Sequence, residues 1–327
     1  MKVAITGASG HIGGLIIREL LKRNHTVKAL VRGKEIKSID GLHVEKIHGD
    51  LDDTIALHHL MESCDALIHA AAIISIDGGM KGLVHHTNVE GTRRVMEAAK
   101  DIGIKRVIHI SSVHAYAQHP MHEVLDEQRA PAGNNTFAYD RSKRDGQALA
   151  LSYSSADMEV LVVNPTSVIS PFDFKPSKLG HAIINMVSGK LPFVFRGGFD
   201  FCDGRDIATA IVNSLTMGRS GEAYLLGGAW HSLSAFAEML TEVSTNKNKP
   251  IALLTIAGWI GLPFINVYAR FRKEEPLYTN EALVAVSEGN RYISSAKANA
   301  ELDYVSRPLR ESLHDSYLWF SKNGYLD

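Results

Sequence analysis

The chain has 327 residues, of which 45% are apolar and 22% charged, and its formal net charge is −1. This is the composition of a globular protein, and so neutral a chain lacks the excess positive charge that nucleic acid or an anionic membrane attracts. Cys64 and Cys202 are its two cysteines, a number that argues against a disulfide framework or a zinc site and favours a reducing cytoplasm.

The N-terminal stretch predicts a strand at 2–6 followed by a helix that begins at residue 11. Its apolar run is too short for a signal peptide. Between the two elements, Gly7, Gly10 and Gly13 recur at intervals of three. A glycine turn that leads into a helix presents unpaired N–H groups to a phosphate, with one glycine for the tight turn, one for close ligand approach and one for helix packing. We therefore expect a dinucleotide's diphosphate at this helix N-terminus.

The second strand, "TVKALVR", ends at Arg32. In dinucleotide-binding folds an acid at this point accepts the ribose hydroxyls of NAD, whereas an arginine pairs with the 2′-phosphate of NADP. The sequence therefore favours NADP over NAD. A third strand, "HVEKIHGDL", places Asp50 at the same edge, where its carboxylate can accept a hydrogen bond from the adenine amino group.

Strand-like and helix-like segments continue to alternate as far as residue 165, with strands expected at 64–72, 105–113 and 158–168. A helix between the first two of these strands is expected to stop near Gly103. This alternation predicts an α/β fold, a Rossmann-type doubly wound parallel sheet, whose ligands bind at the carboxyl edge of the strands. We expect residues 1–165 to form the NAD(P)-binding domain, with a return to it at about 198–228. Residues 166–197 and 229–327 would form a smaller, mostly helical substrate lobe. Within it, the uncharged run 251–269 is interpreted as buried and not membrane-spanning, because glycines and a proline interrupt it.

The fifth predicted strand and the helix after it carry three polar side chains that could act together in catalysis. Tyr139 and Lys143 are four residues apart in "YDRSK", so they share one face of a predicted helix, and Ser112 ends the preceding strand. A nearby ammonium favours the phenolate form of a tyrosine, which makes Tyr139 a proton donor and acceptor for a carbonyl or alcohol. The Ser112 hydroxyl can hold the same oxygen.

The order of these segments resembles one known family. "TGASGHIGG", "GDL", "HAAA", "TNVEGT", "SS", "YDRSK" and "NPTSVISPFD" follow one another as in the extended short-chain dehydrogenase/reductases of the NAD-dependent epimerase/dehydratase family. The resemblance runs over almost the whole chain and implies Ser112, Tyr139 and Lys143 as catalytic residues, and a homodimer formed through the helices after the fourth and fifth strands. It also implies cofactor contacts or support from Gly7, Ala8, Ser9, Gly10, His11, Ile12, Gly13, Arg32, Asp50, Leu51, Ala70, Ala71, Ala72, Asn88, Ser111, Tyr139, Lys143, Asn164 and Thr166.

One departure favours the reductase branch of the family. Many nucleotide-sugar epimerases have "RP" and then "VYGP" where this chain has "NPTSVISP", which is closer to dihydroflavonol 4-reductase-like enzymes. We therefore expect an NADP-dependent oxidoreductase that reduces a ketone or aldehyde of a small organic substrate. The alternatives are a nucleotide-sugar epimerase or dehydratase and a dinucleotide-sensing regulatory protein. Intact catalytic residues argue against the regulator, and a diphosphate-binding cluster among Arg196, Arg205, Arg219, Arg270, Arg272 and Arg291 would favour the epimerase.

The remaining polar candidates are histidines and aromatic residues. No metal site is expected, because the sixteen histidines show no H-x-x-x-H spacing. His69 is interpreted as packed or flanking the cofactor, with a proton shuttle as the alternative. His114 and Tyr116 are left open between lining the substrate side and ending a loop. Phe172, Phe174 and Phe193 are candidates for an apolar pocket wall, with core packing as the alternative reading.

Overall fold

The structure, a computed structural model, describes residues 1–33, 36–75, 78–244, 250–254, 258–259 and 279–326. Its centre is a seven-stranded parallel sheet with the order β10-β6-β5-β4-β1-β2-β3. The strands are β1 (Lys2–Thr6), β2 (Thr26–Val31), β3 (Glu45–His48), β4 (Ala66–His69), β5 (Arg106–Ile110), β6 (Glu159–Pro165) and β10 (Ala223–Leu226). From β1 the chain adds β2 and β3 on one side of the sheet, and then β4, β5, β6 and β10 on the other side. In such a sheet ligands bind at this switch point, between β1 and β4.

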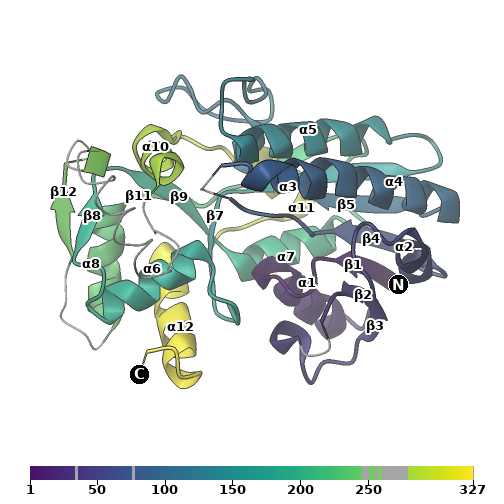
Figure 1. Ribbon diagram of the computed structural model, residues 1–327, viewed down its shortest axis with the longest axis horizontal. Coiled ribbons are helices and arrows are strands. Elements are labelled where there is room, and N and C mark those ends of the chain that lie inside the picture. The colour runs from purple at the N-terminus through teal and green to yellow at the C-terminus, as the bar shows by residue number, and fades with distance from the viewer. Residues whose placement is uncertain (34–35, 76–77, 245–249, 255–257, 260–278, 327) are drawn as a thin grey trace.

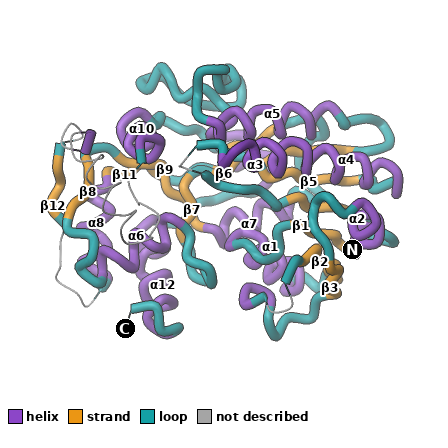
Figure 2. The backbone as a smooth tube through the Cα atoms, viewed as in Figure 1, coloured by secondary structure: helices purple, strands orange, loops and turns teal. Residues whose placement is uncertain are grey.

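Helices cover both faces of the sheet (Figure 2), which explains why its central strands are continuous apolar runs. One face packs against α1 (His11–Lys22), α7 (Gly204–Asn213) and α11 (Ala296–Leu302). The other face packs against α2 (Thr54–Met61), α4 (Gly91–Ile102) and α5 (Ala138–Ser152), and a short α3 (Leu83–His85) precedes a π-helical turn at His86–Glu90. Helix α4 ends at Gly103, whose left-handed backbone is the glycine stop that the sequence predicts. The doubly wound α/β fold is thus confirmed.

A second lobe lies at the opposite end of the molecule from β3 (Figure 1). It contains a sheet of β7 (Ser167–Ile169), β9 (Gly198–Asp203) and β11 (Ala229–Ser232), and a pair of β8 (Phe193–Phe195) and β12 (Ile251–Leu253). Its helices are α6 (Lys178–Val187), α8 (Leu233–Val243), α10 (Asn280–Glu288) and α12 (Leu309–Lys322). Phe201, Phe236 and Phe320 are fully buried at its centre. Between β9 and β11 the chain returns to the large sheet, where it forms α7 and β10. Strand β9 itself belongs to the second lobe.

Most of the uncharged run 251–269 lies outside the described residues, and so do Arg270 and Arg272. Among the helices that the structure describes, none has the length and apolar character needed to span a bilayer. The described residues also contain no group of three histidine, cysteine or acidic side chains placed to hold a metal ion.

Candidate active site

The glycine turn is shaped by close backbone contacts. Gly7 has φ +77°, and a Cβ atom there would lie 2.5 Å from the carbonyl carbon of Ala70 at the end of β4. A Cβ on Gly13 would lie 2.1 Å from the carbonyl oxygen of Gly7. Both positions therefore exclude a side chain, because the turn, the neighbouring strand and the first turn of α1 occupy the space it would need.

The N-terminus of α1 has no side-chain cap. Its N-cap residue is Gly10, which is exposed and donates its own N–H to the Gly7 carbonyl oxygen at 2.9 Å. Ser9 is exposed beside it, Ala8 is buried, and His11 and Ile12 are half-buried. The first-turn N–H groups of a helix need acceptors, and an anion can supply them. The residues present therefore fit a dinucleotide diphosphate.

The predicted adenosine contacts lie along the carboxyl edge of the sheet. Arg32 follows β2 and is exposed. Asp50 follows β3, is also exposed, and accepts the N–H of Asp52 at 2.9 Å. After β4, Ala70 and Ala71 are half-buried and Ala72 is exposed, as is expected of residues along which a ligand can lie; Leu51 is half-buried.

The structure brings Ser112, Tyr139 and Lys143 together between the end of β5 and the first turns of α5. All three side chains are buried, Tyr139 being 9% exposed. The Ser112 hydroxyl lies near enough to the Tyr139 phenol to lower its pKa, against the effect of burial. The Lys143 ammonium donates to the carbonyl oxygen of Ile110 at 3.1 Å, which fixes it beneath the strand end.

Burial dominates the electrostatics of this cluster. It raises the pKa of Tyr139 to about 12, although the hydrogen bond with Ser112 acts in the opposite direction; the Asp140 carboxylate raises it further. It also lowers the pKa of Lys143 to about 8. In this arrangement the cost of burying a phenolate outweighs the effect of the nearby polar groups.

Buried amides hold the loop that carries Ser112. The Asn164 amide nitrogen, at the end of β6, donates to the Ser112 carbonyl oxygen at 2.9 Å and to the Gln147 side chain at 2.6 Å. Ser111 donates to the Lys143 carbonyl oxygen at 3.4 Å. Thr166 donates to Asp200 of β9 at 2.7 Å. The sequence reading did not find Gln147, although its place one helical turn after Lys143 is a usable indication.

Asn88 lies in the π-helical turn, and its side-chain amide is engaged by the protein. It pairs with the backbone of Ile73 at 2.8 and 2.9 Å and donates to Ser142 at 2.9 Å, while Ser142 donates to the Tyr139 carbonyl oxygen at 2.7 Å. His69 is fully buried within hydrogen-bond distance of Thr6 and Thr92, and burial lowers its pKa to about 3. These groups connect the strand edge with α5.

His114 and Tyr116 have different surroundings in the structure. The His114 ring meets the Tyr139 ring edge-on at 5.5 Å between centroids, and its Nδ1 atom lies 2.9 Å from the Asp140 carboxylate. Tyr116 is buried and accepts from Gln147 at 3.2 Å. His114 thus borders the Tyr139 phenol, and Tyr116 packs behind the loop. Asp140, beside Tyr139 in sequence, also escaped the sequence reading.

Sheet order, glycine turn and the Ser112–Tyr139–Lys143 cluster together define the class of protein as a nicotinamide dinucleotide-dependent short-chain dehydrogenase/reductase. The family model described as "NAD dependent epimerase/dehydratase family" matches residues 3–227, and the chain belongs to that family. The resemblance found in the sequence is therefore confirmed.

Three similar proteins span the full length of the chain. Sterol demethylase protein B of Methylococcus capsulatus is 28% identical, and the alignment covers 100% of both chains. A Synechocystis sp. protein provisionally named dihydroflavonol 4-reductase is 28% identical over 98% of this chain and 95% of its own. The crystal structure of gox2253 superposes with a TM-score of 0.85 at 29% identity, over 100% of this chain and 99% of the other. Further relatives are named as ketoreductases and as dTDP-glucose 4,6-dehydratases, so both reaction types occur among the homologues.

Proposed function

We propose that the chain is an NADP-dependent oxidoreductase that reduces a ketone or aldehyde of a small organic substrate. The observation that carries this proposal is the convergence of Ser112, Tyr139 and Lys143 at the carboxyl edge of the same sheet that carries the glycine turn. When bound, the dinucleotide supplies hydride to the carbonyl carbon. The Tyr139 hydroxyl donates its proton to the carbonyl oxygen as negative charge develops there, and the Ser112 hydroxyl holds the same oxygen. Lys143, one helical turn after Tyr139, stabilises the phenolate that remains.

The preference for NADP rests on Arg32. Its exposed position directly after β2 lets the guanidinium reach the adenosine ribose, and a guanidinium pairs well with a phosphate dianion. An acidic residue would be needed at this position to accept the ribose hydroxyls of NAD. Tighter binding of NADH than of NADPH would refute this part of the proposal.

Three of the six candidate arginines have partners within the protein, which favours a small organic substrate over a nucleotide sugar. Arg205 is paired with the carboxylates of Asp203 and Asp315, both at 2.6–2.9 Å. Arg219 is held by Glu301 at 2.8 and 3.0 Å. Arg291 lies 5.0 Å from the centre of the Trp230 ring. Each of these three side chains already has a partner within the protein, whereas binding of a sugar diphosphate needs cationic groups that are available to the ligand. Dehydratases among the relatives make the nucleotide-sugar reaction the competing proposal.

The experiment measures NADPH and NADH binding by fluorescence and then screens carbonyl compounds, with sterol ketones included because of the name of one full-length relative. UDP- and dTDP-sugars form the second arm. We expect net NADPH oxidation with a ketone or aldehyde, loss of turnover in Tyr139→Phe, and normal turnover in the matched control Tyr153→Phe at the end of α5. Conversion of a nucleotide sugar without net change in nicotinamide absorbance would favour the competing reaction.

We also propose a homodimer formed through α4 and α5, the helices that follow β4 and β5. The two helices pack side by side on the same face of the large sheet. Light scattering coupled to size-exclusion chromatography tests this directly, and a monomeric mass at micromolar concentration would contradict it.

A further inference from the structure

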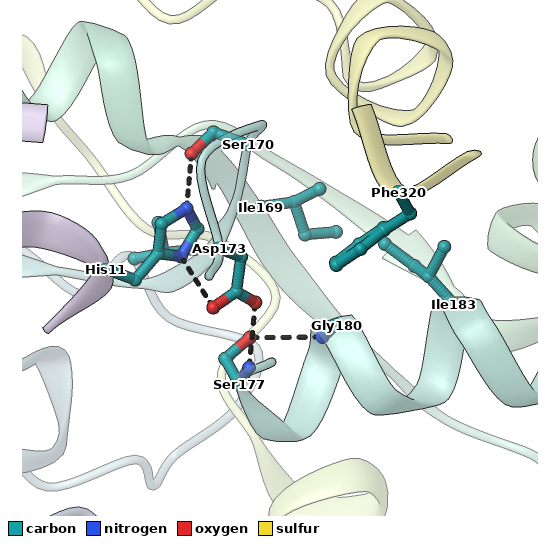
Figure 3. A pocket seen from close by; sticks show the side chains of 9 residues that line it. His11, Ile169, Ser170, Asp173, Ser177, Gly180, Ile183 and Phe320 are labelled. Atoms are coloured by element: carbon teal, nitrogen blue, oxygen red, sulfur yellow. Dashed lines mark hydrogen bonds and ion pairs between the residues drawn. The ribbon is translucent and has the colours of Figure 1, made fainter. Parts of the chain in front are cut away.

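His11 links the diphosphate turn to the second lobe (Figure 3). It is the first residue of α1, and its ring points toward the loop that follows β7. The Nε2 atom lies 2.8 Å from the Ser170 hydroxyl and 3.1 Å from the Pro171 carbonyl oxygen. The Nδ1 atom faces Asp173 Oδ1 at 3.9 Å. One imidazole at the start of α1 therefore connects the helix that follows the glycine turn with the second lobe.

Asp173 is a buried carboxylate with one oxygen still to be satisfied. Its side chain is 2% exposed. Oδ2 accepts the Ser177 N–H at 2.7 Å, while Oδ1 has no hydrogen bond from the described residues. Ser177 caps α6 by accepting the Gly180 N–H at 3.0 Å. A Cβ on Gly180 would lie 2.4 Å from Oδ2, so the helix leaves room for this carboxylate. An unsatisfied buried carboxylate oxygen is costly, which indicates a partner that acts in the working state.

The residue before Asp173 has a strained backbone conformation. Phe172 has φ +68°, a left-handed conformation that costs a non-glycine residue of order 1–3 kcal/mol and that clusters at functional sites. Its ring packs under the Arg18 guanidinium at 4.7 Å and beside Trp319 at 6.3 Å. These contacts hold the turn that aims Asp173 at His11.

The hydrogen-bond partners decide which form of His11 this site accommodates. The Pro171 carbonyl can only accept, and Ser170 donates to that same oxygen at 3.2 Å, so Nε2 carries a hydrogen. A neutral ring would then aim the Nδ1 lone pair at a carboxylate oxygen. A second proton at Nδ1 removes that repulsion and gives Oδ1 its partner, once the side chains approach by about 1 Å.

The other charged groups around this contact are already engaged or lie on other faces. Arg18 of α1 stacks on Phe172, and Arg205 of α7 is paired with Asp203 and Asp315. Tyr325 donates to the Phe174 carbonyl oxygen, and its pKa is raised by burial and then by Asp173. Helix α6 carries Lys178, which has a contact of its own, and His181, which is exposed. Of the residues that line the cavity between α1 and α6, His11 and Asp173 are the titratable ones.

We propose that His11 is a positioning residue for the nicotinamide dinucleotide, and that its protonated ring, paired with Asp173, couples dinucleotide binding to the placement of α6. This inference rests on the proposed dinucleotide site. A diphosphate at the N-terminus of α1 adds negative charge near the ring, so binding and protonation favour each other. Dinucleotide affinity therefore increases as the pH falls.

The test compares NADPH dissociation constants of the full-length wild type and His11→Gln between about pH 6 and pH 8.5. Glutamine keeps a donor for Pro171 but cannot carry the charge. The ratio of the two constants at each pH removes the ionisation of the ligand itself. We expect His11→Gln to bind about tenfold more weakly at the lower pH and within about threefold of wild type at the higher pH. His181→Gln on α6 is the matched control and should follow the wild type throughout.

Hydrogen exchange at the start of α6 gives a second readout that a purely structural role would not change. NADPH should slow exchange of the Ser177 and Gly180 amides in the wild type, and should slow it much less in His11→Gln and in Asp173→Asn. Should Asp173→Asn fail to fold, His11→Gln alone decides. A wild-type pH profile and wild-type protection in His11→Gln would overturn the inference while the dinucleotide site stands. Failure of the wild type to bind any nicotinamide dinucleotide would overturn both.

Discussion

Replacing Lys143 by methionine should stabilise the folded protein while it slows turnover, because the phenolate left on Tyr139 loses its stabilising ammonium. Lys143 is 5% exposed, and burial lowers its pKa from 10.5 to about 8. Methionine has a similar length and no charge to desolvate. Active sites often keep such unfavourable groups at the expense of stability.

The magnitude follows from linkage between protonation and folding. Between about pH 8 and pH 10.5 the unfolded lysine binds a proton that the folded one has lost, so the lysine destabilises the fold at neutral pH and stability rises as the pH increases through this window. A shift of this size corresponds to about 3 kcal/mol at pH 7. The bond from Lys143 to the Ile110 carbonyl offsets about 1 kcal/mol. Lys143→Met should therefore gain about 2 kcal/mol at pH 7.

Urea unfolding followed by circular dichroism measures this difference. The advantage of Lys143→Met should shrink by about 2 kcal/mol between pH 7 and pH 9.5, because the wild-type lysine becomes neutral in the folded state while the unfolded lysine keeps its proton. Lys100→Met, at an exposed position of α4, should change stability by less than about 0.5 kcal/mol at either pH. A Lys143→Met variant that is less stable than wild type at pH 7, or a difference that does not vary with pH, would refute the reasoning.

Three further outcomes are expected. Gly13→Ala places a methyl group 2.1 Å from the Gly7 carbonyl oxygen and should lower the free energy of unfolding by more than about 2 kcal/mol. A Cβ on Gly10 would lie 3.3 Å from the same oxygen, so Gly10→Ala should cost less stability and act mainly on dinucleotide affinity. Equal losses of stability in urea melts would contradict this. Tyr139→Phe should lower kcat by about 10²–10⁴-fold with NADPH affinity unchanged, because only the proton donor is removed, and full retained turnover would disprove its role. Arg32→Ala should weaken NADPH binding at least about tenfold and leave NADH binding nearly unchanged; an equal loss for both would show that Arg32 does not contact the phosphate.

The large sheet could be read from the sequence because its elements are local. Each central strand is an apolar run bounded by turn residues, and Gly103 ends α4 where a glycine stop is expected. The glycine turn and the Tyr139–Lys143 spacing are also short-range patterns, so the residues around the site could be named before their geometry was known.

What escaped the sequence depends on contacts between distant segments. The contact between His11 and Asp173 joins residues from two lobes, and the strained backbone of Phe172 carries no sequence pattern. The raised pKa of Tyr139 depends on how completely the fold buries the phenol, which spacing along a helix cannot reveal. The small strands of the second lobe are only three to six residues long, too short for a periodic pattern.

The most direct measurement follows deuterium from the reactive carbon of labelled NADPH during turnover with a ketone or aldehyde found in the screen. The account predicts that the label appears on the carbinol carbon of the alcohol product, with one NADPH consumed per product molecule and no transfer in Tyr139→Phe. Product that carries no label, or catalysis confined to nucleotide sugars without consumption of NADPH, would contradict it.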